Sequence, residues 1–236
     1  MSRRRFFVDR FHHGQAVIDG ARAHHLRQVL RVQPGQTFEL SDTRRLYLAR
    51  VASATNAAVT FHLDSELPVP PPLPEVTLLA AIFKFDRFEW MLEKSTELGV
   101  TRIVPLIASR TGPGLAQSAA KRLDRWRRIV EESAQQSRRM APPGIDSPAD
   151  LASALHTAPP GSRWILDETL AGAPPPAAAP AVLLSGPEGG FTDAERAAAA
   201  ALDFLPVSLG PLILRAETAP LAALAVALSN RRMSRK

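Results

Sequence analysis

The sequence predicts an α/β protein in which a small β domain precedes a parallel sheet with helices on both faces. Three observations lead to this fold class. Segments typical of strands and of helices alternate after residue 75, whereas short strands prevail before residue 68, and a run of prolines separates the two regions. Alternation is typical of a parallel sheet, because each crossover helix packs on the sheet as it returns the chain to the next strand. We therefore expect two domains, over residues 1–70 and 75–236.

The first region shows the alternation of apolar and polar residues that is typical of half-buried strands. We expect short strands there at Arg5–Val8, Thr37–Leu40, Leu46–Ala52 and Val59–Leu63. One helix is expected over Ala23–Val32, closed by Pro34-Gly35. Short strands at close spacing predict a small barrel. The proline-rich segment Leu67–Pro74 can continue neither a helix nor a central strand, so we expect an extended spacer.

The second region contains apolar runs typical of buried strands and longer segments typical of helices. The expected strands are Val76–Phe83, Ile103–Ala108, Trp164–Asp167, Ala181–Ser185 and Phe204–Ser208. The expected helices are Phe85–Leu98, Ser118–Met140, Asp193–Leu202 and Arg215–Asn230. Gly99 stands at the usual position after a helix end, and Thr192 with Glu195 forms a capping-box pattern. The low-complexity segment 171–180 is expected to be a surface loop.

The composition is that of a globular chain without disulfides. The 236 residues are 45% hydrophobic and 22% charged, which argues against global disorder. Cysteine is absent, so a disulfide framework and a catalytic thiol are excluded and we expect a cytoplasmic protein. The longest apolar stretch, Ala219–Leu228, is about half of the roughly 20 residues that a membrane span needs. No apolar core follows Arg3–Arg5, so no signal peptide is expected.

Positive charge is concentrated near the N-terminus. Residues 1–50 contain ten arginines and four acidic residues, which accounts for the entire formal net charge of +6. A second basic stretch covers Lys121–Arg139. The planar guanidinium group pairs with phosphate through two hydrogen bonds and stacks on bases, so both stretches are compatible with a nucleic-acid partner. A solvated basic surface without a partner is the alternative.

Two loops rich in glycine and proline follow predicted strands of the second region. The first is Ser185–Phe191, and the second is Leu209–Leu214. Ligands of parallel sheets bind at the carboxyl ends of the strands, where these loops lie. Gly190 is followed by Phe191 rather than by the Lys-Ser/Thr of a phosphate-binding P-loop, and the glycine spacing does not match a dinucleotide fingerprint. Ordinary turns are the alternative to a binding site.

The two loops together carry a resemblance to a known family. The segments Gly186–Gly190 and Leu209–Ala219 resemble motifs of the RsmE family, the 16S ribosomal RNA (uracil-N3) methyltransferases of the SPOUT superfamily. Earlier segments are similar to the family in the same order, namely His25–Arg31, Glu93–Val100 and Gln136–Arg138 with Pro142. The resemblance extends over nearly the whole chain, and the two C-terminal loops are its most specific part.

This resemblance implies a PUA-like barrel, a SPOUT-type domain with a deep C-terminal trefoil knot, and a homodimer. It implies S-adenosylmethionine (SAM) as cofactor, held by the loops after the last three strands, and 16S rRNA of the small ribosomal subunit as substrate, with no metal and no membrane. Two positions depart from the family pattern: Leu212 stands where arginine is usual, and Ala216 where threonine is usual. Leu212 removes a positive charge, so any substrate contact by that arginine is missing or is made by another one.

Methyl transfer to uracil N3 requires loss of the imide proton, which leaves an anion spread over O2 and O4. Arginine beside a carbonyl oxygen would stabilise this anion, and a carboxylate would accept the proton. Because Arg215 and Glu217 flank the second loop at the start of the last helix, they are the catalytic candidates. The alternatives are an ion pair for Arg215 and a helix-dipole interaction for Glu217. Glu188 is a second candidate base, with the alternative that it holds its own loop through backbone N–H groups.

The adenine and ribose of the cofactor are expected to contact apolar side chains and main-chain groups of the two loops. The expected cofactor-binding residues are Leu184, Gly186, Pro187, Glu188, Gly190, Leu209, Gly210, Ile213, Leu214 and Thr218. Leu184 and Ile213 would be core residues under any interpretation, so their assignment rests on the resemblance. The final helix is rich in alanine and leucine, which permits close packing, and we expect part of it at a dimer interface.

RNA contacts are expected from the basic N-terminal region and from the basic helix. The residues are Arg3, Arg4, His25, Arg27, Arg31, Lys94, Arg125 and Arg138. The arginines would meet phosphates, so binding should weaken with salt. For His25, which would stack or cap, an ordinary position on a helix surface is the alternative.

Two other functions fit parts of the sequence. A non-catalytic RNA-binding ribosome-assembly factor with a SPOUT-like domain would be compatible with Leu212. A metabolic enzyme on an open α/β sheet with an acidic substrate would fit the loops but would leave the basic N-terminal region unexplained. SAM binding, followed by a methyl-transfer assay on small ribosomal subunits, separates these possibilities from the enzyme.

Overall fold

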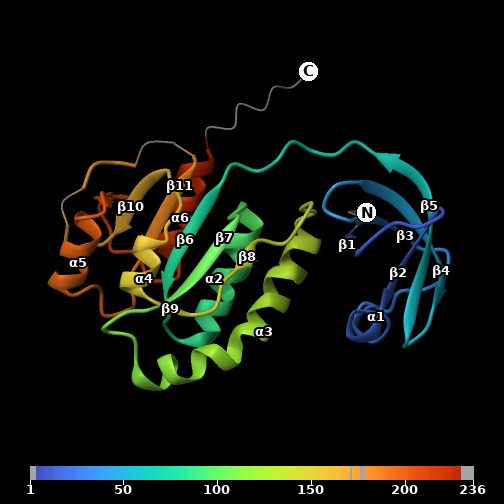
Figure 1. Ribbon diagram of the computed structural model, residues 1–236, viewed down its shortest axis with the longest axis horizontal. Helices are drawn as coiled ribbons and strands as arrows, with labels where there is room; N and C mark the ends of the chain where they lie inside the picture. Colours follow the sequence, from blue (N-terminus) through green and yellow to red (C-terminus); the bar gives the residue numbers. More distant parts are fainter. Residues whose placement is uncertain (1–3, 171, 176–178, 230–236) are drawn as a thin grey trace. The chain divides into compact units, whose positions relative to one another are not determined.

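The computed structural model describes residues 4–170, 172–175 and 179–229, which form two compact units (Figure 1). The N-terminal unit holds the described residues up to Pro72 together with Ala134–Pro142, and the C-terminal unit holds Leu73–Ser133 and the described residues from Pro143 onward. The change of unit at Pro72 falls inside the proline-rich segment, which carries neither helix nor strand between residues 68 and 75. The inclusion of Ala134–Pro142 in the N-terminal unit was not indicated by the sequence.

The N-terminal unit is built on a five-stranded sheet in the order β1-β3-β4-β5-β2. Its elements are β1 (Arg5–Phe7), β2 (Gln15–Asp19), α1 (Gly20–Gln28), β3 (Thr37–Ser41), β4 (Leu46–Ala54) and β5 (Ala58–Leu67). The four predicted strands are confirmed, with shifted ends. Strand β2 was missed, although it alternates as a half-buried strand should, with Ala16 and Ile18 buried. Helix α1 begins three residues earlier than predicted and ends at Gln28 rather than at Val32.

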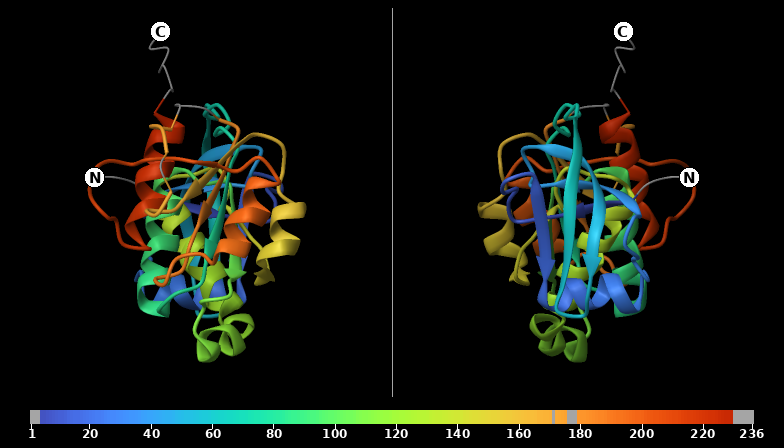
Figure 2. Two further views of the ribbon diagram at one scale, coloured as in Figure 1. Left: turned by 90° about the vertical axis from the view of Figure 1, so that its left-hand side faces the viewer. Right: turned by 90° about the vertical axis from the view of Figure 1, so that its right-hand side faces the viewer.

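This sheet is curled and open rather than a closed barrel (Figure 2, right). Strands β1 and β2 form its two edges, and only the β1–β3 pair is parallel. Register shifts between β4 and β5 at Leu48/Ala49 and Val51/Ser53 bend the strands. Leu26 on α1 packs with Phe6 and Phe61 of the sheet in one core. The predicted small barrel is therefore found as a curled half-barrel, because the two edge strands do not pair with each other in the described residues.

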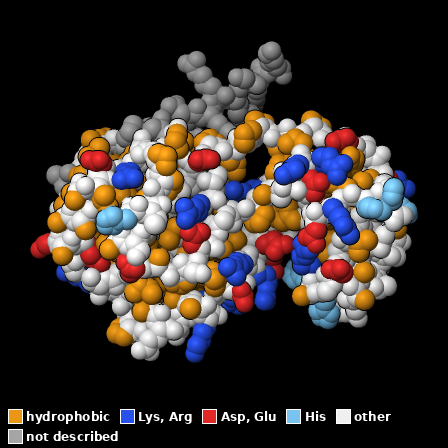
Figure 3. Space-filling view, in the orientation of Figure 1, with side chains coloured by type: hydrophobic (Ala, Val, Ile, Leu, Met, Phe, Trp, Pro, Cys, Tyr) orange, Lys and Arg blue, Asp and Glu red, His pale blue; other side chains and the backbone are white. Residues whose placement is uncertain are grey.

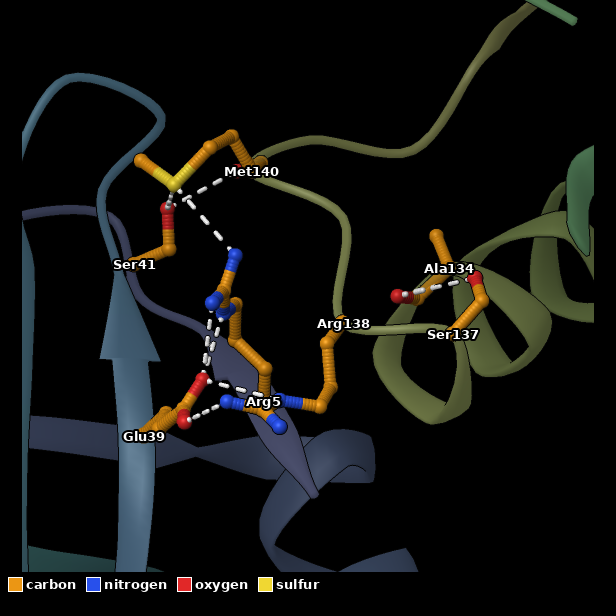
Figure 4. Close-up of polar contacts among 7 residues, drawn as sticks. All are labelled: Arg5, Glu39, Ser41, Ala134, Ser137, Arg138 and Met140. Carbon is orange, nitrogen blue, oxygen red and sulfur yellow. Dashed lines mark hydrogen bonds and ion pairs between the residues drawn. The ribbon is translucent and has the colours of Figure 1, made fainter. Parts of the chain in front are cut away.

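A buried ion-pair cluster holds the segment Ala134–Pro142 within the N-terminal unit (Figure 4). The buried carboxylate of Glu39 accepts hydrogen bonds from Arg5 Nη2 at 2.7 Å and from the guanidinium of Arg138. Ser41 Oγ donates to the carbonyl oxygen of Met140 at 2.8 Å. Arg138 has a φ of +59°, which the regular helix does not allow. The predicted helix to Met140 is thus too long, since the chain leaves the helical conformation to reach this cluster.

The C-terminal unit contains a seven-stranded sheet in the order β12-β10-β11-β6-β7-β8, with β9 also paired to β7. Every pairing described for it is parallel, as the sequence predicts. Its strands are β6 (Val76–Ala81), β7 (Arg102–Ile107), β8 (Gly144–Ile145), β9 (Ala149–Asp150), β10 (Ser162–Leu166), β11 (Ala181–Ser185) and β12 (Leu205–Pro206). The helices are α2 (Phe85–Leu98), α3 (Pro113–Gln136), α4 (Leu151–His156), α5 (Asp193–Ala200) and α6 (Thr218–Leu228).

Helices cover both faces of this sheet, and the alternation along β6 shows how. Leu78 belongs to a core with Phe88 of α2, Trp126 of α3 and Leu224 of α6. The next residue, Leu79, belongs to the core on the other face, with α4 and α5. Figure 2 (left) shows α6 (red) on one side of the strands and α4 (yellow) and α5 (orange) on the other. The predicted two-layer cover of a parallel sheet is confirmed.

Helix ends marked by local sequence signals were predicted correctly. Helix and strand ends that depend on contacts with distant residues were not. Gly99 follows α2 with a φ of +112°, and Thr192 and Glu195 form both hydrogen bonds of a capping box at α5. Strands β8 and β9 have two residues each and α4 has six, so none shows a detectable period. Helix α6 begins at Thr218, so the segment from Arg215 to Glu217 lies in a turn before it. The end predicted at Asn230 lies outside the described residues, and the trefoil knot stays a prediction.

Candidate active site

Two adjoining cavities lie at the carboxyl ends of β10, β11 and β12, which the sheet order places in one group. Cavity A has a volume of about 330 Å³ and lies between the loop after β10 and the segment Val207–Leu214. Cavity B has a volume of about 430 Å³ and lies between Ser185–Phe191, the segment Ile213–Glu217 and Arg87. Both volumes are in the range of small-molecule sites. Their shared wall consists of Leu166, Asp167, Glu168, Ile213, Leu214 and Ala219.

Cavity A is lined by leucine, isoleucine and other apolar residues together with the polar residues Asp167, Glu168 and Ser208. Gly172 closes it on one side, where a Cβ would lie 2.7 Å from the carbonyl oxygen of Pro206, so a side chain cannot fit without displacing backbone. Leu212 and Ile213 lie at the rim and are highly exposed. Large apolar side chains exposed side by side are typical of a surface that contacts a ligand or partner.

The loop Gly186–Gly190 forms one wall of cavity B and is held by short-range geometry. A Cβ on Gly186 would lie 3.0 Å from the buried ring of Phe191. Gly190 has a φ of +69°, a conformation that favours glycine, and its N–H donates to the carbonyl oxygen of Pro187 at 2.9 Å. Arg110 Nη1 donates to the carbonyl oxygen of Gly189 at 2.6 Å. These contacts give the loop a defined shape at the cavity wall.

Glu217 is a buried carboxylate in cavity B with an incomplete set of partners. Its side chain is 11% exposed, and Oε2 has no hydrogen-bond partner. Oε1 lies 3.8 Å from Arg87 Nη1 and 4.0 Å from Arg215 Nη1. A buried oxygen without a partner is costly, and such groups in folded proteins are often functional. Glu217 precedes α6, but its side chain makes no capping hydrogen bond to this helix. No hydrogen bond therefore supports the alternative that Glu217 serves to interact with the helix dipole.

Arg215 and Glu188 lie in the same cavity. Arg215 is 74% exposed, and its ion pair with Glu217 is long, at 4.0 Å. The alternative that Arg215 serves only as an ion-pair partner of Glu217 is therefore weakly supported. Glu188 Oε1 accepts from Arg87 Nη1 at 3.4 Å. In the described residues Glu188 thus pairs with the Arg87 side chain of α2 rather than with the backbone N–H groups of its own loop.

Asp167, in the shared wall, is a site residue that the sequence analysis did not single out. Its side chain is 1% exposed and accepts hydrogen bonds from Arg196 Nε at 2.8 Å and from Thr169 Oγ1 at 2.7 Å. Burial by itself would raise the pKa of Asp167, but the hydrogen bonds and the positive charge of Arg196 hold this pKa below its usual value. The available signal was an acidic pair, Asp167-Glu168, directly after a buried strand.

We expect Asp167→Asn to lower the free energy of unfolding at neutral pH by about 2 kcal/mol, because it removes a charge-assisted hydrogen bond. The pKa of Asp167 is lowered in the folded state, so this stabilisation is complete above the unfolded pKa of about 3.9 and is lost as the pH falls through the lower folded value. The difference between wild type and variant should therefore shrink below about pH 4. Urea denaturation between pH 3 and 7 measures it.

Asp193→Asn is the matched control for this prediction. Asp193 pairs with the same arginine, Arg196, at 2.8 Å but is almost fully exposed. Solvent screens such a pair, so its loss should leave stability nearly unchanged. Equal destabilisation by both variants would contradict the structural role assigned to Asp167.

The structure brings most of the predicted cofactor-binding residues together. Those that line the cavities are Gly186, Pro187, Glu188, Gly190, Leu209, Gly210, Ile213 and Leu214. Leu184 does not line either cavity but is fully buried in the core beneath α4 and α5. Thr218 is exposed in the first turn of α6 and does not line them either. The core alternative thus fits Leu184, whereas Ile213 is exposed at a cavity wall and is not a core residue.

Several of the predicted RNA-binding side chains already have protein partners. Arg125 Nε donates to both oxygens of Glu89 at 2.8 Å, and Lys94 Nζ donates to Glu93 at 2.7 Å and to Glu97 at 2.8 Å. These hydrogen bonds raise the pKa values of Arg125 and Lys94 above their usual values. Within the N-terminal unit, Figure 3 shows acidic side chains interspersed with the basic ones. The charge available to RNA on these surfaces is therefore smaller than a count of basic residues suggests.

The remaining predicted RNA-binding residues differ in exposure. Arg27 Nη1 donates to the carbonyl oxygen of Val32 at 2.8 Å, and Arg138 pairs with Glu39 beyond the end of α3. Arg4 and His25 are partly buried, whereas Arg31 is exposed. Arg3 lies outside the described residues. Arg31 is thus the N-terminal candidate in this set with the freest access to solvent.

Neither a metal centre nor a membrane-spanning helix is found in the part of the chain that the structure describes. No group of three or more histidine or acidic side chains there is arranged to hold a metal ion. Likewise, no described helix combines the length and the apolar character needed to cross a bilayer.

Comparison with known families identifies the two halves of the chain. Residues 70–228 match a family described as an RNA methyltransferase domain, and residues 18–63 match an RNA methyltransferase PUA domain. Ribosomal RNA small subunit methyltransferase E of Synechocystis is 38% identical over 219 residues, which cover 87% of this chain and 70% of that protein. The protein of the same name from Bacillus subtilis is 28% identical and covers 88% and 87%.

Solved structures agree with these matches. Ribosomal RNA small subunit methyltransferase E from Neisseria gonorrhoeae, bound to S-adenosyl methionine, is 31% identical, with a TM-score of 0.81 and coverage of 97% of this chain and 98% of that one. A Legionella pneumophila protein in complex with SAM has a TM-score of 0.87 at 29% identity over the same shares. The resemblance drawn from the two loops is confirmed: the chain belongs to the ribosomal RNA small subunit methyltransferase E (RsmE) family.

Proposed function

We propose that this protein transfers a methyl group from SAM to N3 of a specific uridine in 16S rRNA of the small ribosomal subunit. The names of its relatives and the SAM in two similar structures support this activity. The observation that carries the proposal is Glu217, which lines a cavity at the carboxyl ends of three neighbouring strands and whose buried Oε2 has no hydrogen-bond partner. Carboxyl ends of parallel strands are where such sheets bind ligands.

The cavities suit the cofactor in both polarity and charge. Leu166, Leu209 and Ile213 offer apolar surface to a flat base, and the glycine loop offers backbone groups for polar contacts. Glu168 and Glu217 place negative charge beside the space in which a cationic sulfonium would lie. The cofactor supplies an electrophilic methyl group bound to that sulfonium.

The roles of the chain's own residues follow from the chemistry of the imide. The Glu217 carboxylate would accept the N3 proton, because Glu217 lines the cavity and its Oε2 has no hydrogen-bond partner. The guanidinium of Arg215 would hold the carbonyl oxygen of the base and stabilise the negative charge that develops there. The low exposure of Glu217 limits access of water to its carboxylate, which strengthens the interactions that this carboxylate makes.

RNA would be held by the N-terminal unit, with Arg31 as the most accessible of its candidates. Affinity should fall as potassium chloride is raised from 50 to 200 mM, because each neutralised phosphate releases counterions. We expect Arg31→Gln to weaken binding at low salt and to reduce the salt slope by about one. Arg22→Gln, which breaks only the exposed pair with Asp9, is the control and should leave the slope unchanged. Fluorescence anisotropy with a labelled rRNA fragment measures both, and a flat salt response would remove this surface from the proposal.

We also infer the knot and the homodimer from family membership. On α6, Ala223, Leu224 and Ala227 face the core, while Ala225 is exposed and permits close approach of a second copy. Light scattering at micromolar concentration tests the dimer.

A substrate in ribosomal RNA would place the protein in the cytoplasm.

Three measurements test the proposed function. Calorimetric titration asks whether SAM binds, and transfer of a tritiated methyl group asks whether small subunits accept it. Mass spectrometry of 16S rRNA from cells with and without the protein identifies the modified base. Binding of SAM without transfer to any form of the subunit would favour the non-catalytic assembly factor, for which Leu212 in place of arginine is the supporting feature.

A further inference from the structure

Cavity B receives one side chain from outside the strand-end loops. Arg87 lies in the first turn of α2, which follows the central strand β6. All other residues that line cavity B belong to segments 166–168, 185–191 and 213–219. Arg87 is separated from Glu188 by 101 positions in the sequence, so the fold alone brings its guanidinium to this place.

The guanidinium of Arg87 bridges two carboxylates from different parts of the cavity wall. Its Nη1 lies 3.4 Å from Glu188 Oε1 and 3.8 Å from Glu217 Oε1. The Arg87 side chain is 39% exposed, and ion pairs of this exposure contribute little to stability. A contribution to folding stability therefore does not explain this bridge well. The position of the bridge in the cavity suggests a role in the reaction.

The bridge has two consequences for the catalytic candidates. It holds Glu217 through Oε1 only, so that Oε2 stays without a partner. It also lies about as close to Glu217 as Arg215 does, at 3.8 and 4.0 Å, and therefore shares the neutralisation of this carboxylate with Arg215. Arg215 remains largely exposed and available for another anion.

We propose that Arg87 is a positioning residue for methyl transfer, which pairs with Glu188 and Glu217 so that the Glu217 carboxylate is held at the cavity wall for the imide proton and Arg215 stays free for the carbonyl oxygen of the base. This inference rests on the proposed function. It also assigns a cation to the cavity of a chain that has Leu212 where its family usually has arginine. The charged groups around Glu217 are Arg87 from α2, Glu188 after β11, Arg215 from its own segment, and Asp167 and Glu168 after β10.

The test compares Arg87→Met and Arg87→Lys with the wild type, on small subunits at saturating SAM. We expect Arg87→Met to lower kcat by about 10- to 100-fold, because a misplaced reacting group costs up to about this much. The Kd of SAM, measured by calorimetry, should change by less than about threefold. Arg87→Lys keeps the charge and should restore part of kcat.

Arg102→Met is the matched control. Arg102 is 41% exposed and pairs with Asp146 at 2.6 Å at the start of β7, where it lines neither cavity. It should leave kcat unchanged. If Arg87→Met retains the wild-type kcat, or if Arg87→Lys restores none of the lost kcat, the inference is overturned while the proposed function stands. If the wild type transfers no methyl group, the proposed function and the inference both fail.

Discussion

Replacement of Arg215 by alanine is expected to lower kcat for methyl transfer by about 100- to 1,000-fold, the usual cost of removing a group that stabilises developing negative charge. Arg215 lines cavity B. Its side chain is 74% exposed, and its guanidinium lies 4.0 Å from the Glu217 carboxylate. Its loss should therefore leave the fold and the Kd of SAM nearly unchanged. Single-turnover transfer of a tritiated methyl group to small subunits measures kcat, and calorimetry measures the Kd.

Two further variants sharpen the test of Arg215. Arg215→Lys keeps the charge but loses the planar pair of donors, so it should recover only part of the rate. Arg102→Met again controls for the loss of an arginine elsewhere in the same unit. Undiminished turnover by Arg215→Ala would remove this residue from the mechanism, and a raised Kd of SAM with unchanged kcat would reassign it to cofactor binding.

We expect Glu217→Gln to lower kcat by about 100- to 10,000-fold, because the amide cannot accept the imide proton. The variant should be no less stable than the wild type, since glutamine has nearly the same volume and removes a buried charge whose Oε2 has no partner. The same transfer assay, with thermal unfolding, gives both results.

Glu188→Gln is the comparison for Glu217. Glu188 lines the same cavity and pairs with the same Arg87, but its side chain is 43% exposed against 11% for Glu217. We expect a much smaller fall in kcat from Glu188→Gln. If the two variants exchange these effects, Glu188 is the proton acceptor and Glu217 has the structural role near the start of α6.

The sequence placed the two loops correctly because their signals are local. Glycines with positive φ, such as Gly190 and Gly210, mark turns that few other residues accept, and Thr192 with Glu195 fixes the helix that follows the first loop. The apolar run of β11 was predicted with its observed ends, since a strand buried on both faces is a continuous apolar segment. The edge of the sheet that holds the site therefore followed from periodicity and turn chemistry.

Such local signals could not predict contacts between residues that are far apart in the sequence. Arg87 and Asp167 resemble surface charges in the sequence, and only the arrangement of α2, β10 and α5 brings them to Glu217 and Arg196. Likewise, Arg138 was assigned to RNA, whereas the fold turns its guanidinium to Glu39, 99 positions away. Whether an ionisable side chain is free or paired depends on which charge lies within a few ångströms, and the sequence does not give that distance.

The sequence by itself determined the parallel sheet, its helical cover, the family and the loops that bound the cavities, because each depends on residue patterns within a short segment. The tertiary structure decided that the N-terminal sheet is open, that Leu184 belongs to the core, and that Glu217 keeps one oxygen without a partner. These features depend on how separate segments fill space and neutralise charge together. The catalytic interpretation rests on them, since an isolated motif contains Glu217 but neither the burial nor the Arg87 guanidinium that determine what its carboxylate does.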